Sequence, residues 1–365
     1  MRNVIRAKVL GLLCILVLGG ILAAGLEPFR RPRNAVTWLE NENGLRFGNY
    51  GTIYSPGTLV AEAPQDYSSW TIEIWLQAAR GNAVNTFLSF YRPENQTQFS
   101  LQQYHSNLAI ARGIRGEPHR GDIVGVDGVF REIKPVFISI TSGAQKTSVY
   151  LDGALAESLP QFRLNANYTG QLVIGTSPVR NEKWSGELKG LAIYRGELTP
   201  AQVRQHYETW TAQGRPELSG NDHAMAVYLL NERSGNVVHS AVGAGMDLYI
   251  PERYSLLHQK FLEPFWKEFK PGRKYLKDVL INIAGFIPFG FFFCAYWSSV
   301  RPIKHAVLAT VLLGFIVSLT IEILQSYLPT RGSGTTDLIT NTLGTFLGVK
   351  LYASKTAQAL LAKVF

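Results

Sequence analysis

Four apolar runs stand out along the chain, at Val9 to Leu26, Val279 to Trp297, Ala306 to Leu324 and Leu338 to Tyr352. A helix needs about 20 apolar residues to cross a bilayer, so the first three runs are long enough. The fourth is shorter and needs neighbouring helices to cover it. The pattern predicts one transmembrane helix at residues 1–26 and three more within residues 278–353.

The region between these runs has a different period. Apolar and polar residues alternate in short stretches that Gly, Asn and Asp separate, as strands and turns require. Many short strands without a helical period between them predict a β-sandwich, which we assign to residues 27–215. The clearest of these stretches are 69–78, 86–91, 135–141 and 147–153.

One amphipathic helix closes the predicted sandwich. Thr199 and Pro200 have the residue types of an N-cap and a first helical position. After them, a single helix face carries Val203, His206, Tyr207 and Trp210.

Three segments follow or flank these parts. Residues 216–257 are predicted as a β-rich connector, with a permuted edge strand that pairs with the sandwich. Residues 258–277 mix aromatic residues with Lys and Arg, which suits the headgroup layer of a membrane, although a linker with a small hydrophobic cluster would look similar. Residues 354–365 are predicted as a cytoplasmic tail.

The few polar residues of the C-terminal runs recur at helical spacing. Asp278 shares a helix face with Asn282, Ser318 shares one with Glu322 and Gln325, and Asp337 shares one with Asn341, Gly344 and Gly348. The two glycines form a surface for close helix packing. Carboxylates inside a membrane usually mark a function, so this polar cluster, together with Arg331 from the intervening loop, is the candidate site.

Charge and cysteine content narrow the class of protein. The net charge is +9, but Glu27 to Lys277 holds 27 Lys and Arg against 24 Asp and Glu, so most of the excess flanks the apolar runs. This argues against a nucleic-acid partner and for a membrane lipid bilayer as partner. If all four runs cross, both termini lie on the cytoplasmic side by the positive-inside rule, and the sandwich lies outside. The two cysteines, Cys14 and Cys294, lie within apolar runs and predict no disulfide in the sandwich.

The sandwich segment resembles a known fold family. The stretches TIEIWLQA, SVYLDGAL and LVIGTSPVRNEKWSGELKGLAIYRGELTPAQV are similar to laminin-G-like, concanavalin A-like domains, over about residues 44–210. The resemblance implies a jelly roll of two antiparallel sheets, which often serves as a glycan- or protein-binding module. It leaves the ligand-binding residues unknown.

The C-terminal part resembles VanZ-like bacterial membrane proteins, a family linked to teicoplanin resistance. The matching stretches are LEPF, DVLINIAGFIPFG, SLTIEILQ and TDLITNTLGTFLGVKLY, over about residues 262–352. That family has one more helix before LEPF, and Val9 to Leu26 is the candidate for it here. We therefore expect the first helix to be retained, although Ala23 and Gly25 would suit signal-peptide cleavage. The resemblance implies a multi-pass protein of the bacterial cytoplasmic membrane with the sandwich inserted in its first external loop.

Two functions and one structural alternative follow. In the first, the sandwich binds a cell-wall or extracellular glycan and the helices recognise an envelope lipid or glycolipid. In the second, the protein is a membrane enzyme in which Glu322 and Asp337 form an acid/base pair and Arg331 orients a phosphate. In the structural alternative, the polar residues only hydrogen-bond between helices, Asp337 is an N-cap and Arg331 anchors to headgroups.

The sequence predicts no metal or cofactor site with a recognisable motif. Asp122, Asp127 and Asp152 lie in predicted turns where Ca²⁺ would find carboxylates, but such residues more often only make turns. Trp75, Tyr104 and Trp184 are of the residue types that stack on sugars, although core packing is the more common role of such aromatics.

Overall fold

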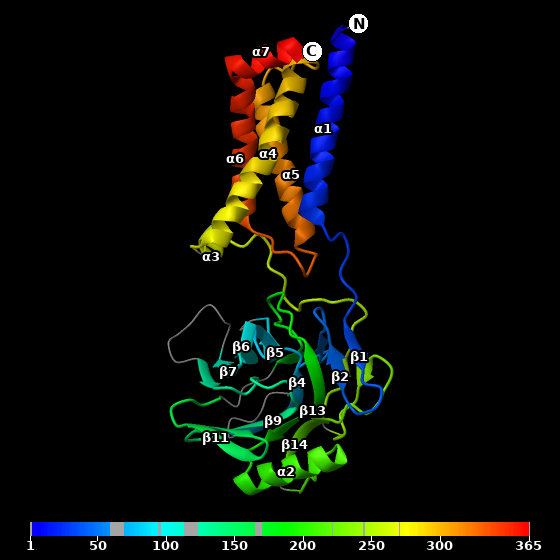
Figure 1. The fold of residues 1–365 in the computed structure, drawn as a ribbon, viewed down its shortest axis with the longest axis vertical. Coiled ribbons are helices and arrows are strands. Elements are labelled where there is room, and N and C mark those ends of the chain that lie inside the picture. The colour runs from blue at the N-terminus through cyan, green and yellow to red at the C-terminus, as the bar shows by residue number, and fades with distance from the viewer. Residues whose placement is uncertain are drawn as a thin grey trace. The chain divides into compact units, whose positions relative to one another are not determined.

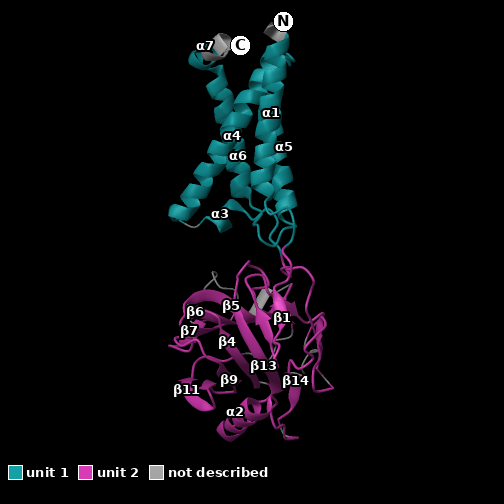
Figure 2. Cartoon of the chain, turned by 45° about the vertical axis from the view of Figure 1, so that its right-hand side comes forward, with its two compact units in different colours: residues 1–31, 259–365 teal, residues 32–258 magenta. Residues whose placement is uncertain are grey.

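The computed structural model of the 365-residue chain describes residues 2–58, 69–93, 96–112, 123–164, 170–220, 222–243, 245–269 and 271–364. The chain divides into two compact units (Figure 2). One comprises Pro32–His258, and the other comprises Met1–Arg31 together with Gln259–Phe365. We describe each unit by itself.

The unit Pro32–His258 is a sandwich of two antiparallel sheets, which confirms the predicted fold class (Figure 1). The order in one sheet is β1-β2-β13-β4-β9-β10-β11, with β14 also paired to β13, and the order in the other is β15-β16-β3-β12-β5-β6-β7-β8. The strands are β1 (Val36–Trp38), β2 (Leu45–Phe47), β3 (Ile53–Tyr54), β4 (Trp70–Ala78), β5 (Ala83–Arg92), β6 (Gln96–His105), β7 (Asn107–Arg112), β8 (Ile123–Val126), β9 (Val136–Ser142), β10 (Thr147–Leu151), β11 (Ala154–Leu159), β12 (Gln171–Ile174), β13 (Gly186–Arg195), β14 (Ala224–Tyr228), β15 (Val237–Val238) and β16 (Leu248–Tyr249).

The apolar positions of the alternating strands form the core between the sheets. Ile72 and Ile74 of β4 stand opposite Ile193 and Leu191 of β13, and all four are buried. The larger core cluster also contains Trp184, which is nearly inaccessible to solvent. The period-2 pattern therefore places one face of these strands in the core between the sheets, as expected.

The helix α2 (Pro200–Gln213) packs on the outer face of one sheet (Figure 1). Thr199 caps it with a capping box that includes Gln202, and Pro200 is its first residue, so the predicted N-terminus is confirmed. Val203, His206 and Trp210 are buried, and Tyr207 packs against the same cluster.

The segment 216–257 contributes strands to both sheets. Ala224–Tyr228 pairs with β13, and Tyr249 of β16 pairs with Tyr54 of β3. The boundary between the two compact units accordingly lies after His258, whereas the sequence-based division put a boundary at residue 215.

The other unit consists of helices (Figure 1). They are α1 (Arg2–Leu26), α3 (Phe265–Glu268), α4 (Arg273–Ser299), α5 (Ala306–Gln325), α6 (Thr335–Ala353) and α7 (Lys355–Val364). In the described residues, three stretches are long and apolar enough to cross a membrane: Val4–Leu26, Arg273–Ser299 and Ala306–Gln325. Helix α6 is not among them, so the predicted count of four membrane-spanning helices stays a prediction.

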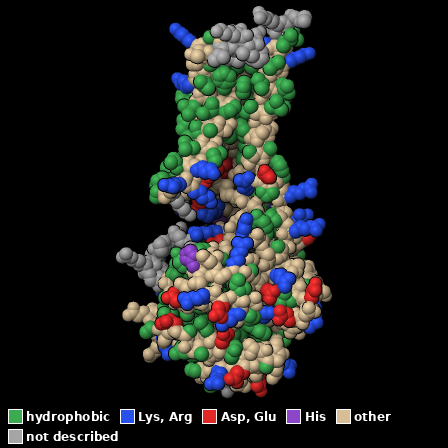
Figure 3. Space-filling model, in the orientation of Figure 1, with side chains coloured by type: hydrophobic (Ala, Val, Ile, Leu, Met, Phe, Trp, Pro, Cys, Tyr) green, Lys and Arg blue, Asp and Glu red, His purple; other side chains and the backbone are tan. Residues whose placement is uncertain are grey.

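The surface of this helical unit suits a lipid environment. Figure 3 shows mainly hydrophobic side chains along the middle of the helices and Lys and Arg towards their ends. The aromatic side chains of the segment before α4 are also exposed, namely Phe261, Phe265, Trp266 and Phe269.

Helix α6 packs on α4 at van der Waals contact of their backbones. A Cβ atom at Gly344 would lie 2.3 Å from the carbonyl oxygen of Ile283, and one at Gly348 would lie 2.1 Å from that of Ile287. A side chain at either position would therefore push the two helices apart.

Candidate functional site

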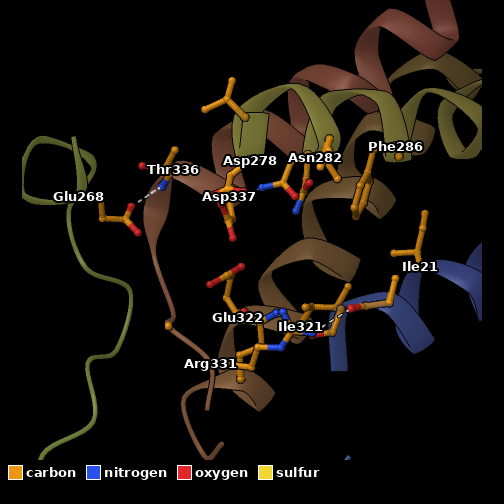
Figure 4. A pocket seen from close by; sticks show the side chains of 18 of the residues that line it. Ile21, Glu268, Asp278, Asn282, Phe286, Ile321, Glu322, Arg331, Thr336 and Asp337 are labelled. Atoms are coloured by element: carbon orange, nitrogen blue, oxygen red, sulfur yellow. Dashed lines mark hydrogen bonds between the residues drawn. The ribbon is translucent and has the colours of Figure 1, made fainter. Parts of the chain in front are cut away.

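A cavity of about 550 Å³ lies at one end of the helical unit. Its wall comes from the C-terminal ends of α1, α3 and α5, the N-terminal ends of α4 and α6, and the loop between α5 and α6. Figure 4 shows Asp278, Asn282, Glu322, Arg331 and Asp337 around the same space. Of the residues that the sequence pattern singled out, the cavity brings together Asp278, Asn282, Glu322, Gln325, Arg331, Asp337 and Asn341.

Ser318 lies beside this cavity instead of lining it. Its side chain is fully buried, and its Oγ accepts a hydrogen bond of 3.0 Å from Nδ2 of Asn341. Gly344 and Gly348 lie farther along α6, against α4. They set how closely α6 approaches α4, while the polar residues line the cavity.

Glu322 links the end of α5 to the start of α6. Its carboxylate is only 1% exposed, and Oε2 accepts a 2.8 Å hydrogen bond from the backbone N–H of Gly334, the N-cap residue of α6. A carboxylate at this point satisfies a free N–H group and interacts favourably with the helix dipole.

Asp337 is not the N-cap of α6, contrary to the structural alternative, because the helix already begins at Thr335. Asp337 lies within the first turn, where its Oδ1 accepts a 2.7 Å hydrogen bond from Nδ2 of Asn282 on α4. Polar hydrogen bonds between helices therefore exist here, as that alternative requires.

Arg331 and Gln325 hold the end of α1 against this site. The guanidinium of Arg331 donates from Nε to the carbonyl of Glu27 at 2.7 Å and from Nη2 to that of Ala24 at 3.3 Å. Nε2 of Gln325 donates to the carbonyl of Gly25 at 2.7 Å. The last carbonyls of α1 thus find partners in the loop and in α5.

Three side chains of the cavity wall contain buried polar atoms that lack a hydrogen-bond partner among the described residues. These atoms are Oε1 of Gln325, Oγ1 of Thr336 and Oδ1 of Asn341, and the three residues are only 7%, 8% and 6% exposed. Buried polar groups are normally paired, so such atoms at a cavity wall are expected to meet a ligand or water.

Sequence reasoning missed Glu268. It lies in α3, and its Oε2 accepts a 2.9 Å hydrogen bond from the backbone N–H of Thr336 while the residue lines the cavity (Figure 4). Helix α3 has only four residues, too few for a periodic signal. The sequence pattern therefore gave no indication of its position.

The cavity wall carries an excess of negative charge. Its carboxylates are Glu268, Asp278, Glu322 and Asp337, and its single basic residue is Arg331. Among the described residues, none of the four carboxylates lies within ion-pair distance of a Lys or Arg, and the ion pair found in this unit is Lys260 with Glu263. The wall contains no Ser, Cys, His or Lys, and no described group of three or more His, Cys, Asp or Glu side chains could hold a metal ion.

The residues proposed for sugar stacking have different positions in the sandwich. Trp184 is buried between the sheets, Trp75 packs partly buried with the cluster under α2, and Tyr104 is exposed. Of the turn aspartates considered for Ca²⁺, Asp127 and Asp152 lie in turns, and Asp122 lies outside the described residues.

A second cluster of ionisable side chains lies under α2 and was not predicted. His206 lies 3.1 Å from Oε2 of Glu73 through Nδ1 and 3.5 Å from Oδ2 of Asp222 through Nε2. The hydroxyl of Tyr194 donates to Glu73 at 2.8 Å. All four residues are almost fully buried, so the cluster fastens α2 to the sheet and offers no open site.

The cluster shifts the pKa values of three of its members. Burial and the neighbouring Glu73 carboxylate raise the pKa of Tyr194. Burial lowers the pKa of His206, but the hydrogen bond and charge of Glu73 outweigh it, and the net pKa is raised above the ordinary 6.5. Burial raises the pKa of Asp222, but hydrogen bonds from Ser219 and Gln202 and the charge of His206 outweigh it and lower the pKa below 3.8.

Comparison with known protein families agrees with both resemblances. Residues 224–357 match the family described as VanZ/LLP1, and residues 47–204 match the family described as the concanavalin A-like lectin/glucanases superfamily. The chain therefore combines a VanZ-like region with a concanavalin A-like domain. The VanZ match begins at β14, so it includes strands of the sandwich unit. No curated protein matches the chain.

Solved structures similar to this chain include toxin and carbohydrate-binding domains. The binding domain of Paraclostridial Mosquitocidal Protein 1 is 14% identical, with a TM-score of 0.35, over 49% of this chain and 47% of that chain. The binding domain of botulinum neurotoxin DC in complex with SialylT is 12% identical, with a TM-score of 0.38, over 48% and 45%. A putative carbohydrate-binding protein from Bacteroides ovatus is 15% identical, with a TM-score of 0.39, over 60% and 63%. The match thus spans about half of the two toxin domains.

Proposed function

We propose that this VanZ-like protein with a concanavalin A-like domain is a multi-pass protein of the bacterial cytoplasmic membrane that recognises an envelope lipid or glycolipid. Its sandwich binds a cell-wall or extracellular glycan outside the cytoplasm. The observation that carries the proposal is the polar cavity at one end of helices that show mainly hydrophobic side chains along their middle part (Figure 3). Polar side chains at membrane depth are costly and are retained where they meet a polar ligand.

Filling the cavity tests the lipid-binding part. Gly285 lines the cavity, and a Cβ atom built there meets no atom within 4 Å, so Gly285→Leu adds bulk at the cavity wall without a clash of its Cβ atom. We expect the purified full-length variant to retain less lipid than the unaltered protein. Gly20→Leu is the matched control, because Gly20 is equally unobstructed but lies outside the cavity wall. Equal lipid retention in the two variants would refute the proposal.

Binding assays with glycans test the sandwich part. The full-length protein in detergent should sediment with cell-wall or exopolysaccharide fractions from its own host, and free saccharides from the same fractions should compete. Sedimentation that no saccharide reduces, or no sedimentation with any fraction, would remove the glycan-binding role.

A membrane enzyme is the second candidate. It is favoured by the common cavity of Glu322 and Asp337, since two neighbouring carboxylates in a poorly solvated site can divide the roles of acid and base. The cavity wall contains no Ser, Cys, His or Lys, so the nucleophile would be water, a substrate hydroxyl or one of the carboxylate or hydroxyl groups of the wall itself. Glu322→Gln and Asp337→Asn should then abolish turnover of a lipid-linked envelope substrate while leaving its binding intact. Unchanged turnover in both variants would dismiss the enzyme.

A further inference from the structure

The wall of the cavity is mostly a hydrogen-bond acceptor surface. Ionised carboxylates only accept hydrogen bonds, and Glu268, Asp278, Glu322 and Asp337 contribute four of them. Oε1 of Gln325 and Oδ1 of Asn341 are amide carbonyl oxygens without a partner among the described residues. The orientation of Gln325 is fixed, because its Nε2 donates to the carbonyl of Gly25, which can only accept. A ligand that suits this wall must therefore bring donors.

The wall also lacks enough positive charge. Glu322 is buried, Glu268 and Asp337 are half-buried and Asp278 is exposed, and no described Lys or Arg forms an ion pair with any of the four. A buried carboxylate without a counter-charge is destabilising. Arg331, the single cation of the wall, uses Nε and Nη2 for carbonyl groups at the end of α1. A positively charged ligand would supply the counter-charge that the protein does not provide for these carboxylates.

A metal ion fits this wall less well than an organic cation. Mg²⁺ and Ca²⁺ need about six or more oxygen ligands that converge on one point. Within the described residues, no three His, Cys, Asp or Glu side chains are arranged in that way. A primary ammonium group carries one charge and three N–H donors, so it needs only about three acceptors around its nitrogen.

The position of Arg331 indicates a second group that the ligand should carry, a phosphate. None of the described residues accepts a hydrogen bond from its Nη1, and Arg331 lines the same cavity as the carboxylates (Figure 4). Guanidinium groups bind phosphate well. An ammonium group placed next to a phosphate would thus meet carboxylates on one side and Arg331 on the other.

We propose that the cavity binds a primary ammonium next to a phosphate, as found in the headgroup of an aminophospholipid. This inference rests on the proposed function and names the headgroup that the helical unit recognises. The two unpartnered amide oxygens and Oγ1 of Thr336 accept the N–H donors, while Glu322 and Asp337 supply the counter-charge.

Competition between three lipids tests the headgroup. The full-length protein is placed in nanodiscs with equal amounts of phosphatidylethanolamine, phosphatidylcholine and phosphatidylglycerol of identical acyl chains, then extracted, and its retained lipid is measured by native mass spectrometry. Phosphatidylcholine keeps the positive charge of the headgroup but lacks N–H donors, and phosphatidylglycerol has no positive charge. We expect phosphatidylethanolamine to be retained at least about tenfold over each, which corresponds to about 1.4 kcal/mol.

Variants of residues in the cavity wall test whether the preference for phosphatidylethanolamine arises in the cavity. Thr336→Val removes Oγ1 with little change of shape, keeps the backbone N–H that bonds Glu268, and should reduce the preference several-fold. Thr320→Val is its control, because that hydroxyl donates to a carbonyl of its own helix. Glu322→Gln with Asp337→Asn should abolish the preference, while Glu27→Gln should keep it, since the Glu27 side chain is exposed and outside the wall.

The outcomes separate this inference from the proposed function. Preferential retention of phosphatidylglycerol or phosphatidylcholine instead would overturn the primary-ammonium assignment and leave lipid recognition standing. Retention of no lipid would overturn both. Displacement of the lipid by millimolar phosphoethanolamine without acyl chains would show the same chemistry but a soluble ligand, and would overturn the lipid as its source.

Discussion

The carboxylate of Glu322 accepts a 2.8 Å hydrogen bond from the backbone N–H of Gly334, twelve residues later in the chain. It therefore closes the loop between α5 and α6 and caps the first turn of α6. This role is structural, and it fixes the position of a carboxylate at the cavity wall.

Truncating this carboxylate should destabilise the helical unit. Glu322→Ala leaves the Gly334 N–H without its buried partner, which costs about 1–3 kcal/mol. Thermal unfolding of the full-length protein in detergent measures the loss as a lower midpoint. Glu27→Ala, at an exposed side chain, should leave the midpoint nearly unchanged. An equal midpoint for both variants would show that the hydrogen bond contributes nothing.

The glycine contacts of α6 give a second prediction. Gly348→Ala places a Cβ atom 2.1 Å from the Ile287 carbonyl oxygen, so α4 and α6 must separate. We expect a loss of about 1–3 kcal/mol in unfolding free energy, as overpacked interiors show. Gly20→Ala in α1, where a Cβ atom meets nothing within 4 Å, should retain the stability of the unaltered protein. The same detergent unfolding assay compares the two, and a Gly348→Ala variant as stable as Gly20→Ala would contradict the packing argument.

The buried cluster under α2 predicts how sandwich stability varies with pH. The raised pKa of His206 contributes stability below pH 6.5 that is lost as the pH rises through the folded-state pKa. The lowered pKa of Asp222 contributes stability above pH 3.8 that is lost as the pH falls through its folded-state pKa. Stability should therefore be greatest between these values and decline on both sides.

Urea unfolding of residues 32–258 at a series of pH values measures this profile. Glu73→Gln removes the charge that raises the pKa of His206, so the decline above pH 6.5 should flatten. Asp247→Asn is the control, because Asp247 pairs with His239 on the surface, where such pairs contribute little. An alkaline decline that persists unchanged in Glu73→Gln would rule out His206 as its source.

Membrane topology is the fourth prediction. After replacement of Cys14 and Cys294 by Ser, a single cysteine at Glu208 should react with a membrane-impermeant reagent in intact cells. One at Lys304, in the loop between α4 and α5, should react only after the membrane is opened, because Arg301 and Lys304 favour the cytoplasmic side. The reverse labelling pattern would place the sandwich in the cytosol and would contradict the predicted topology.

The sequence predicted the structure well where one periodic pattern decided which side chains are buried. Alternation predicted strands because one strand face is buried between the sheets, as at Ile72 and Ile74. Helical spacing grouped Asp278 with Asn282 and Asp337 with Asn341, and the cavity wall contains all four. In both cases, the local pattern depends only on which face of an element is buried.

The sequence did not predict the burial or the partner of a side chain where these depend on an element far away in the chain. Glu73 alternates with the core residues of β4 and so lies on the other face of the strand, which α2 covers and buries. His206 was correctly placed on the apolar face of α2, yet its partner could not be identified before the strand under the helix was known. Glu268 was missed because α3 is too short for a periodic signal and because its partner Thr336 comes from a separate helix.

The contact between Gly348 and the Ile287 carbonyl also bears on how the protein is made. On the proposed topology, α6 is the span that is least able to partition into lipid alone, while α4 is long and apolar. Because α4 leaves the ribosome before α6, the surface that accepts the two glycines already exists when α6 is synthesised. Because α4 is translated first, α6 can pack against α4 as soon as α6 itself is synthesised.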